Sequence, residues 1–150
     1  QLVARIKRMI KTKDHNFQGP AKEKIKSLLI VDDEEGVRRV LKEFFTHKGF
    51  EVFEAESGEQ ALQLLGSIKV AAVLLDMRMP GMDGLEALEK ILKINPKLAV
   101  VMATAEQDEE KIKRAIELGA YSYVLKPFDF VYLELVIMSK LTIKVATPPD

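Results

Sequence analysis

Residues 71–84, AAVLLDMRMPGMDG, are the stretch that decides the fold. The stretch begins as a continuous apolar run, reaches one carboxylate at Asp76, and continues into a loop shaped by proline and glycine. An apolar run bounded by turn residues is typical of a strand buried on both faces, as in a parallel sheet. Open α/β sheets bind their ligands beyond the carboxyl ends of their strands. Asp76 is therefore predicted to lie where such a sheet has its functional site.

The composition excludes several classes of protein. Acidic and basic side chains are equal in number, so no overall positive charge favours binding of nucleic acid by this domain. The absence of cysteine excludes disulfides, thiolate metal sites and cysteine nucleophiles. No apolar run approaches the length of about eighteen residues needed to span a membrane, and no signal-peptide pattern opens the chain. We therefore expect a cytoplasmic protein without a membrane span.

Residues 1–26 differ from the rest of the chain. Residues 1–13 carry apolar side chains at helical spacing along one face and basic side chains over most of the remainder. This spacing predicts a basic amphipathic helix. We interpret residues 1–26 as this helix and a linker, which form a connector or the end of a preceding domain. Contact with a membrane surface or with nucleic acid is the alternative.

From residue 27 onward, strand patterns alternate with helix patterns. Five strands are predicted, at residues 28–31, 50–55, 71–76, 98–103 and 121–125. Apolar side chains at helical spacing predict a helix after each strand, the last over residues 128–141. We interpret residues 27–141 as one domain, and residues 142–150, which lack a clear helical pattern, as a C-terminal tail.

This alternation favours right-handed crossovers and a parallel sheet between two layers of helices. The number and length of the strands suit the flavodoxin-like strand order 2-1-3-4-5, which is adopted from known folds of this kind. The predicted fold class is therefore α/β, a three-layer (βα)5 sandwich, with the N-terminal amphipathic helix in addition.

Polar side chains follow or end four of the predicted strands. Asp32 and Asp33 follow the first strand, Asp76 ends the third, Thr104 directly follows the fourth, and Lys126 follows the fifth. In the expected order, the first and fourth strands flank the third at about 5 Å, which places the acidic pair and Thr104 on opposite sides of Asp76. Lys126 starts roughly 10 Å away, a gap that a long flexible amine can narrow.

Three carboxylates this close repel one another, so at least one pKa should rise unless a cation compensates. Mg²⁺, or Mn²⁺ in its place, suits two carboxylates and a phosphoryl oxygen, because it prefers oxygen ligands and keeps several waters. Asp76 then stays ionised as a potential nucleophile of the kind that forms aspartyl phosphates. Lys126 and the metal would offset charge on the phosphoryl oxygens, and the Thr104 hydroxyl can donate to one of them.

Each of these residues also has an ordinary structural explanation. The acidic pair can cap the next helix, Thr104 can be a strand-end hydroxyl, and Lys126 can be a solvated lysine. Their coincidence at four strand ends favours a site. The sequences concerned are LLIVDDE at residues 28–34, LLDMRMPGMDG at 74–84, VMATA at 101–105 and GAYSYVLKPF at 119–128. Through these motifs the chain, from about residue 26 to residue 141, resembles the receiver domain of bacterial two-component response regulators.

The resemblance implies that Asp76 accepts a phosphoryl group from a histidine kinase or phosphotransfer protein. It implies a signalling module rather than an enzyme, one that catalyses only its own phosphotransfer and autodephosphorylation. It also implies that Asp33 and Asp76 bind magnesium together with the backbone carbonyl of Arg78, while Asp32 acts through water. Lys126 matches the lysine that the family keeps at this site.

The resemblance further implies a switch. Thr104 and Tyr123 match the switch pair of the family, and a phosphoryl group on Asp76 would draw Thr104 inward and vacate space for Tyr123. The face formed by the fourth helix, the fifth strand and the last helix would then change as a population shift. We expect a second copy or an output domain to bind this face or the N-terminal helix. The family also usually has a cis peptide bond before the proline that matches Pro127.

Other functional classes stay open. A magnesium-dependent phosphohydrolase typically has an Asp-x-Asp motif after the first strand, whereas Asp32 and Asp33 are adjacent. A flavin-binding domain would need a phosphate-cradling loop there, and residues 32–35 are all acidic. A receiver that serves only as a docking surface is the third alternative, against which the full acidic set argues.

Overall fold

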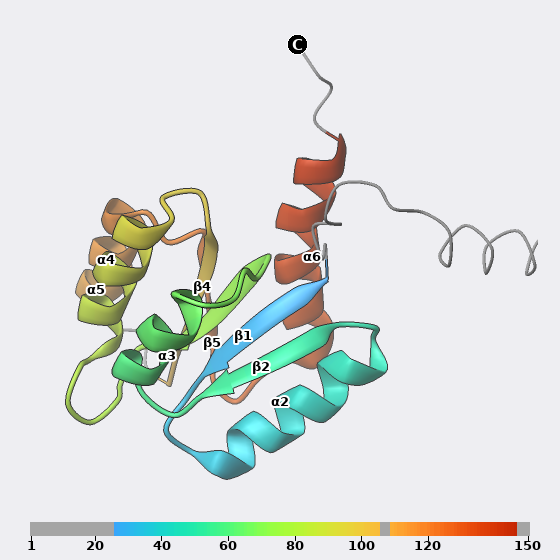
Figure 1. The fold of residues 1–150 in the computed structure, drawn as a ribbon, viewed down its shortest axis with the longest axis horizontal. Helices are drawn as coiled ribbons and strands as arrows, with labels where there is room; N and C mark the ends of the chain where they lie inside the picture. Colours follow the sequence, from blue (N-terminus) through green and yellow to red (C-terminus); the bar gives the residue numbers. More distant parts are fainter. Residues whose placement is uncertain (1–25, 106–108, 147–150) are drawn as a thin grey trace, which may run out of the picture.

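The structure is a computed structural model that describes residues 26–105 and 109–146, with side chains described as far as Leu141 (Figure 1). The strands are β1 (Ser27–Val31), β2 (Glu51–Ala55), β3 (Ala72–Asp76), β4 (Ala99–Thr104) and β5 (Ser122–Leu125). The helices are α2 (Glu35–His47), α3 (Gly58–Leu65), α4 (Gly84–Ile94), α5 (Glu109–Leu118) and α6 (Phe130–Ala146). The predicted N-terminal helix lies outside the described residues.

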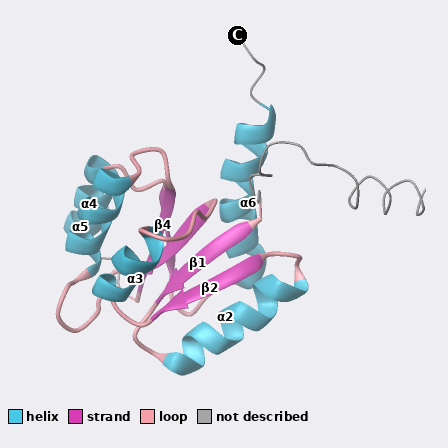
Figure 2. Cartoon of the chain, in the orientation of Figure 1, coloured by secondary structure: helices cyan, strands magenta, loops and turns pink. Residues whose placement is uncertain are grey.

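The strands form one sheet in the order β2-β1-β3-β4-β5, and all of its strand pairs are parallel. This confirms the predicted strand order. Helices cover both faces (Figure 2). Side chains at alternate positions of the strands pack on α3, α4 and α5 on one face, and on α2 and α6 on the other. The two apolar layers thus enclose the sheet as a three-layer sandwich, and the carboxyl ends of all strands meet at one edge.

The ends of the helices follow local capping contacts. The Ser57 hydroxyl accepts a hydrogen bond from the Gln60 N–H at 3.1 Å and so caps the start of α3 at Gly58. The Asp129 carboxylate accepts one from the Tyr132 N–H at 3.1 Å, so α6 begins at Phe130 rather than at residue 128.

The far end of α6 corrects the predicted end of the last helix. The helix continues to Ala146, five residues beyond the predicted end at residue 141. Residues 142–146 include β-branched Thr142, Ile143 and Val145, which have low helix propensity. Extending an existing helix nevertheless adds one hydrogen bond for each residue that it orders, so weak propensity alone does not end it.

Helix α6 is apolar on more than its core side. Leu133, Val136, Ile137 and Leu141 are buried against the sheet, whereas three apolar side chains point outward: Val131 (68% exposed), Tyr132 (53%) and Leu135 (62%). Within the described part of the chain, no helix has both the length and the apolar character needed to cross a membrane.

Candidate functional site

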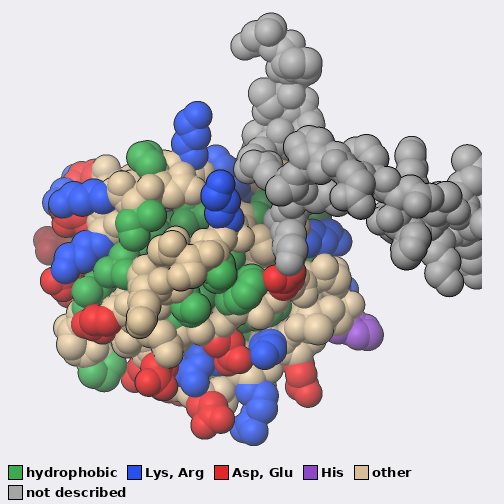
Figure 3. Space-filling model, in the orientation of Figure 1, with side chains coloured by type: hydrophobic (Ala, Val, Ile, Leu, Met, Phe, Trp, Pro, Cys, Tyr) green, Lys and Arg blue, Asp and Glu red, His purple; other side chains and the backbone are tan. Residues whose placement is uncertain are grey.

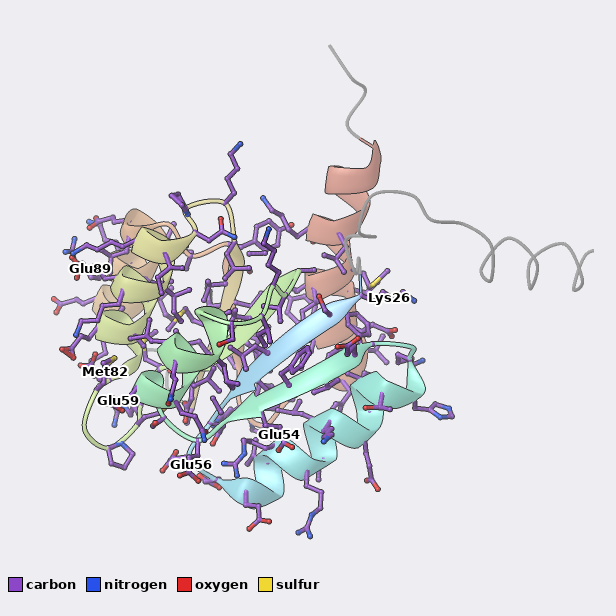
Figure 4. All side chains as sticks on the ribbon, in the orientation of Figure 1. Lys26, Glu54, Glu56, Glu59, Met82 and Glu89 are labelled. Carbon is purple, nitrogen blue, oxygen red and sulfur yellow. The ribbon has the colours of Figure 1, made fainter. Side chains whose placement is uncertain are left out.

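The predicted site residues gather at the carboxyl edge of the sheet. Asp32 follows β1, Asp76 ends β3 and Thr104 ends β4, and these three polar side chains are buried. Figure 4 marks this edge by Glu54 and Glu56 at the carboxyl end of β2, and the opposite edge by Lys26. The parallel strands therefore bring together polar groups that are far apart in the sequence.

Three carboxylates meet at this edge. Asp32, Asp33 and Asp76 each offer one oxygen, and these oxygens lie within 4.8 Å of one another. Asp33 is exposed, whereas the other two are buried, so the cluster opens to solvent on one side. A set of carboxylate oxygens with an open side fits a hard divalent cation such as Mg²⁺, which takes oxygen ligands and keeps some of its waters.

Lys126 reaches across two strands to the acidic cluster. Its Nζ lies 2.8 Å from Asp32 Oδ2 and 3.4 Å from Asp76 Oδ2. Its own N–H donates to the Thr104 carbonyl at 2.8 Å, which continues the β4–β5 pairing, and its peptide bond to Pro127 is cis. The structure thus brings the predicted lysine into direct contact with the acids, as its length allows.

Burial raises the pKa of Asp76, and the neighbouring Asp32 charge raises it further. The Lys126 charge and the hydrogen bond from the Arg78 N–H, at 3.3 Å, lower the pKa but do not cancel the rise. The predicted direction is confirmed, although burial rather than repulsion is its main cause. For Lys126, burial lowers the pKa, but the hydrogen bond to Asp32 and the charges of both acids outweigh it, so the pKa rises and the amine stays charged.

We expect Asp76→Asn to raise the free energy of unfolding at neutral pH in the absence of divalent cations. Because the folded protein raises the pKa of Asp76, it holds that proton more tightly than the unfolded chain does. This stabilising contribution is present below the unfolded pKa and is lost as pH rises through the folded pKa. Urea denaturation at several pH values, with EDTA present, measures the difference between variant and wild type, which should shrink in acid. A variant less stable than wild type at neutral pH would show that pairing with Lys126 outweighs burial.

The loop after β3 is held closely to the strand. The Met77 N–H donates to the Ala103 carbonyl at 2.7 Å, and the Gly84 N–H donates to the Met77 carbonyl at 2.9 Å. Asp83 caps α4 by accepting from the Glu86 N–H at 2.9 Å. The segment that carries Asp76 and Arg78 is therefore fixed at both ends.

We expect Gly84→Ala to lower the free energy of unfolding by about 1–3 kcal/mol, as overpacking usually does. A Cβ at this position would lie 2.5 Å from the Asp76 carbonyl oxygen and 2.6 Å from Met77 Cα. Both are backbone atoms, so the clash can be relieved only if the backbone itself moves. Gly36→Ala is the matched control, because nothing lies within 4 Å of its added Cβ. That variant should be more stable than wild type by about 0.4–1 kcal/mol. Urea denaturation measures both, and equal values would contradict the close approach.

The chain is similar to known proteins in its sequence and in its fold. A protein-family model for the response regulator receiver domain matches residues 28–137, which is more than half of the chain. The chain belongs to the response regulator receiver domain family. A crystal structure of the receiver domain of NtrX from Brucella abortus is similar, with a TM-score of 0.73 and 33% sequence identity, over 77% of this chain and 98% of that one.

Curated relatives of this receiver domain differ in length. It is 38% identical over 117 residues to sporulation initiation phosphotransferase F from Bacillus subtilis, covering 78% of this chain and 94% of that protein. It is 40% identical over 120 residues to the regulatory protein AtoC from Escherichia coli, covering 80% of this chain but only 26% of AtoC. Some proteins with this domain are thus only slightly longer than the domain itself, and others are several times longer.

Sequence reasoning missed the contact of Arg38 near the receiver site, and it gave Gly84 only a place in the loop after the third strand. Arg38 on α2 donates to the backbone carbonyl of Asp32 at 2.6 Å. Gly84 leaves the space in which the backbone of residues 76–77 lies. A glycine directly after a helix cap is a signal for the second, because a close approach requires it. A basic residue six positions after the acidic pair is a weak signal for the first.

Proposed function

We propose that this receiver domain accepts a phosphoryl group on Asp76 from a histidine kinase or a phosphotransfer protein in a reaction that depends on magnesium. The observation that carries the proposal is the buried Asp76 carboxylate, which has two further carboxylates within 4.8 Å and the Lys126 amine at 3.4 Å. Such a set offers a nucleophile, a place for a divalent cation and a fixed positive charge.

The residues that would hold Mg²⁺, or Mn²⁺, are Asp33, Asp76 and the backbone carbonyl of Arg78, with Asp32 acting through water. When bound, the cation supplies positive charge that stabilises the phosphoryl oxygens in the transition state. It would also compensate the crowding of the three acids, of which Asp32 adds to the raised pKa of Asp76.

In the proposed transfer, an oxygen of Asp76 forms a bond to phosphorus while the bond from phosphorus to the donor histidine nitrogen breaks. The imidazole leaves with the electron pair and takes up a proton. Lys126 is already held beside Asp76 by Asp32, so its amine can donate to a phosphoryl oxygen without a large movement. The Thr104 hydroxyl, buried at the end of β4, can donate to another. Hydrolysis of the acyl phosphate by water would return the domain to its resting state.

Incubation with acetyl phosphate and magnesium tests this function. The intact mass should increase by one phosphoryl group, and EDTA should prevent the increase. A domain that gains no phosphoryl group under these conditions, or gains it equally well with EDTA, would contradict the proposal. Continuous release of inorganic phosphate without a stable mass increase would instead favour a phosphohydrolase.

We further propose that phosphorylation changes the face formed by α5, β5 and α6. Thr104 ends β4 and is buried, while Tyr123 lies on the adjacent strand, opposite Met102, and is 40% exposed. Movement of Thr104 toward a phosphoryl group would open space for Tyr123 to turn inward. The same face exposes further apolar side chains, namely Ile116, Leu125, Val131, Tyr132 and Leu135. Exposed apolar side chains that gather on one face are typical of binding surfaces for other proteins.

Beryllofluoride with magnesium is expected to shift the NMR signals of the Tyr123 ring, because the complex mimics the phosphoryl group and draws Thr104 inward. The ring of His47, which ends α2 and lies outside this face, reports on changes not specific to the switch. An unchanged Tyr123 environment in the saturated complex would contradict the proposed switch.

The partners and the domain limits are proposals as well. We propose that residues 1–26 are a helix and linker that connect this domain, residues 27–141, to another part of a longer protein, in keeping with the small share of AtoC that it covers. An output domain or a second copy would bind the α5–β5–α6 face or the N-terminal helix. We propose a cytoplasmic location, in keeping with the proposed kinase partner.

A further inference from the structure

Arg38 joins α2 to the acidic site through the backbone. Its side chain is 12% exposed and makes two directed contacts. Nη1 donates to the Asp32 carbonyl at 2.6 Å, and Nε donates to Glu54 Oε1 at 3.3 Å. Glu54 lies at the carboxyl end of β2 (Figure 4), where its other oxygen is 3.4 Å from Lys42 Nζ. The Arg38 guanidinium is thus bound to Glu54 on β2 and to the backbone of Asp32 directly after β1.

Asp32 is fixed at all of its polar atoms. Its N–H donates to the Ala55 carbonyl at 3.1 Å, and its carbonyl accepts from Arg38. Its carboxylate accepts from the Glu34 N–H at 2.9 Å and from Lys126 Nζ at 2.8 Å. These contacts restrict both the backbone and the side chain of Asp32.

Asp33, in contrast, is exposed, so burial does not fix its carboxylate. The carbonyl that Arg38 holds belongs to the peptide unit that joins Asp32 to Asp33. That peptide unit includes the N and Cα atoms of Asp33, so its orientation influences where the Asp33 side chain leaves the backbone. A contact with the Asp32 carbonyl therefore acts on the position of Asp33.

The charge of Arg38 is balanced where it lies. An uncompensated cation beside three carboxylates would weaken the binding of a divalent cation by repulsion. Here the guanidinium is paired with Glu54, so it can fix the backbone at a reduced electrostatic cost to the site. Acidic and basic side chains lie interspersed along the lower margin of the space-filling view (Figure 3).

We propose that Arg38 is a positioning residue that orients Asp33 for binding of the divalent cation, an inference that rests on the proposed function. Groups that orient metal ligands typically change metal affinity by 10–100-fold when they are removed. A positioning role and a purely electrostatic role predict opposite changes in magnesium affinity when Arg38 is replaced. Loss of a nearby positive charge alone would tighten magnesium binding, whereas loss of the positioning contact weakens it.

Isothermal titration with Mg²⁺ of wild type, Arg38→Met and Arg39→Met tests the proposal. Arg39 is the matched control, because it is the next residue of α2, carries the same charge and is exposed. We expect the dissociation constant of Arg38→Met to rise by about tenfold, and that of Arg39→Met to stay equal or fall slightly. A thermal melt in EDTA verifies that each variant is folded. If Arg38→Met is not folded, Arg38→Lys replaces it, and its affinity should also fall because an amine lacks the two-pronged geometry.

The outcomes separate this inference from the proposed function. If wild type binds magnesium and Arg38→Met binds it as tightly as Arg39→Met does, the positioning role is wrong and the proposed function stands. If wild type binds no magnesium, both are overturned, and if only Asp33→Asn leaves the affinity unchanged, the positioning role alone is wrong.

Discussion

Asp76→Asn is expected to abolish the gain of a phosphoryl group from acetyl phosphate and magnesium. An amide oxygen is a far weaker nucleophile than a carboxylate, and the amide also removes one of the charges that would hold the cation. Asp76 is buried between β1 and β4, and among the residues that the structure describes, acids outside the group Asp32, Asp33 and Asp76 lack both the cluster and Lys126. Intact mass spectrometry of both proteins after the same incubation measures the effect.

Asp83→Asn provides the matched control for this loss. Asp83 lies on the same loop, but it caps α4 with its carboxylate, and asparagine is an equally good cap. That variant should therefore accept the phosphoryl group at nearly the wild-type rate. A phosphorylated Asp76→Asn protein would show that another residue is the acceptor and would contradict the assignment of Asp76.

Lys126→Met is expected to slow phosphorylation by a factor on the order of 10², the usual cost of removing one preorganised donor from a developing anion. The methionine keeps the length of the side chain but removes the amine that lies 3.4 Å from Asp76 Oδ2. The initial rate of mass gain with acetyl phosphate measures the effect. Lys140→Met is the control, because Lys140 Nζ lies over the Tyr121 ring rather than at the acidic cluster.

Lys126→Met should also bind magnesium more tightly than wild type. The Lys126 amine lies 2.8 Å from Asp32 and 3.4 Å from Asp76, so it repels a second cation at that place. Slower transfer together with tighter metal binding separates a role in the transition state from a role in holding the cation. Weaker magnesium binding with an unchanged rate would contradict this account of Lys126.

Most of the fold could be predicted from the sequence because its elements have clear patterns. The apolar run that ends at Asp76 predicts a buried central strand, and β3 has that place between β1 and β4. The alternation of strands and helices requires a parallel sheet, but it leaves several strand orders possible. The observed order was predicted through known folds, since no local pattern determines which strands are neighbours.

The sequence predicted those parts of the candidate site whose residues lie at the ends of strands. Asp32, Asp76 and Thr104 come together because parallel strands end at one edge, and Lys126 is long enough to reach them. The contact of Arg38 depends on how α2 is rotated against β1 and β2. Helical spacing predicts which side of a helix faces the core, but not which backbone atom a side chain at its border reaches. The end of α6 was missed for a related reason, because propensity does not show where an established helix stops.

A crystal structure with magnesium and beryllofluoride tests the central claim most directly, namely that clustered acids hold one divalent cation beside Asp76 so that its carboxylate can be phosphorylated. We predict beryllofluoride on Asp76 and one Mg²⁺ at about 2.0–2.1 Å from Asp33, Asp76 and the Arg78 carbonyl oxygen. Magnesium bound away from these residues, or beryllofluoride on a different side chain, would contradict the claim.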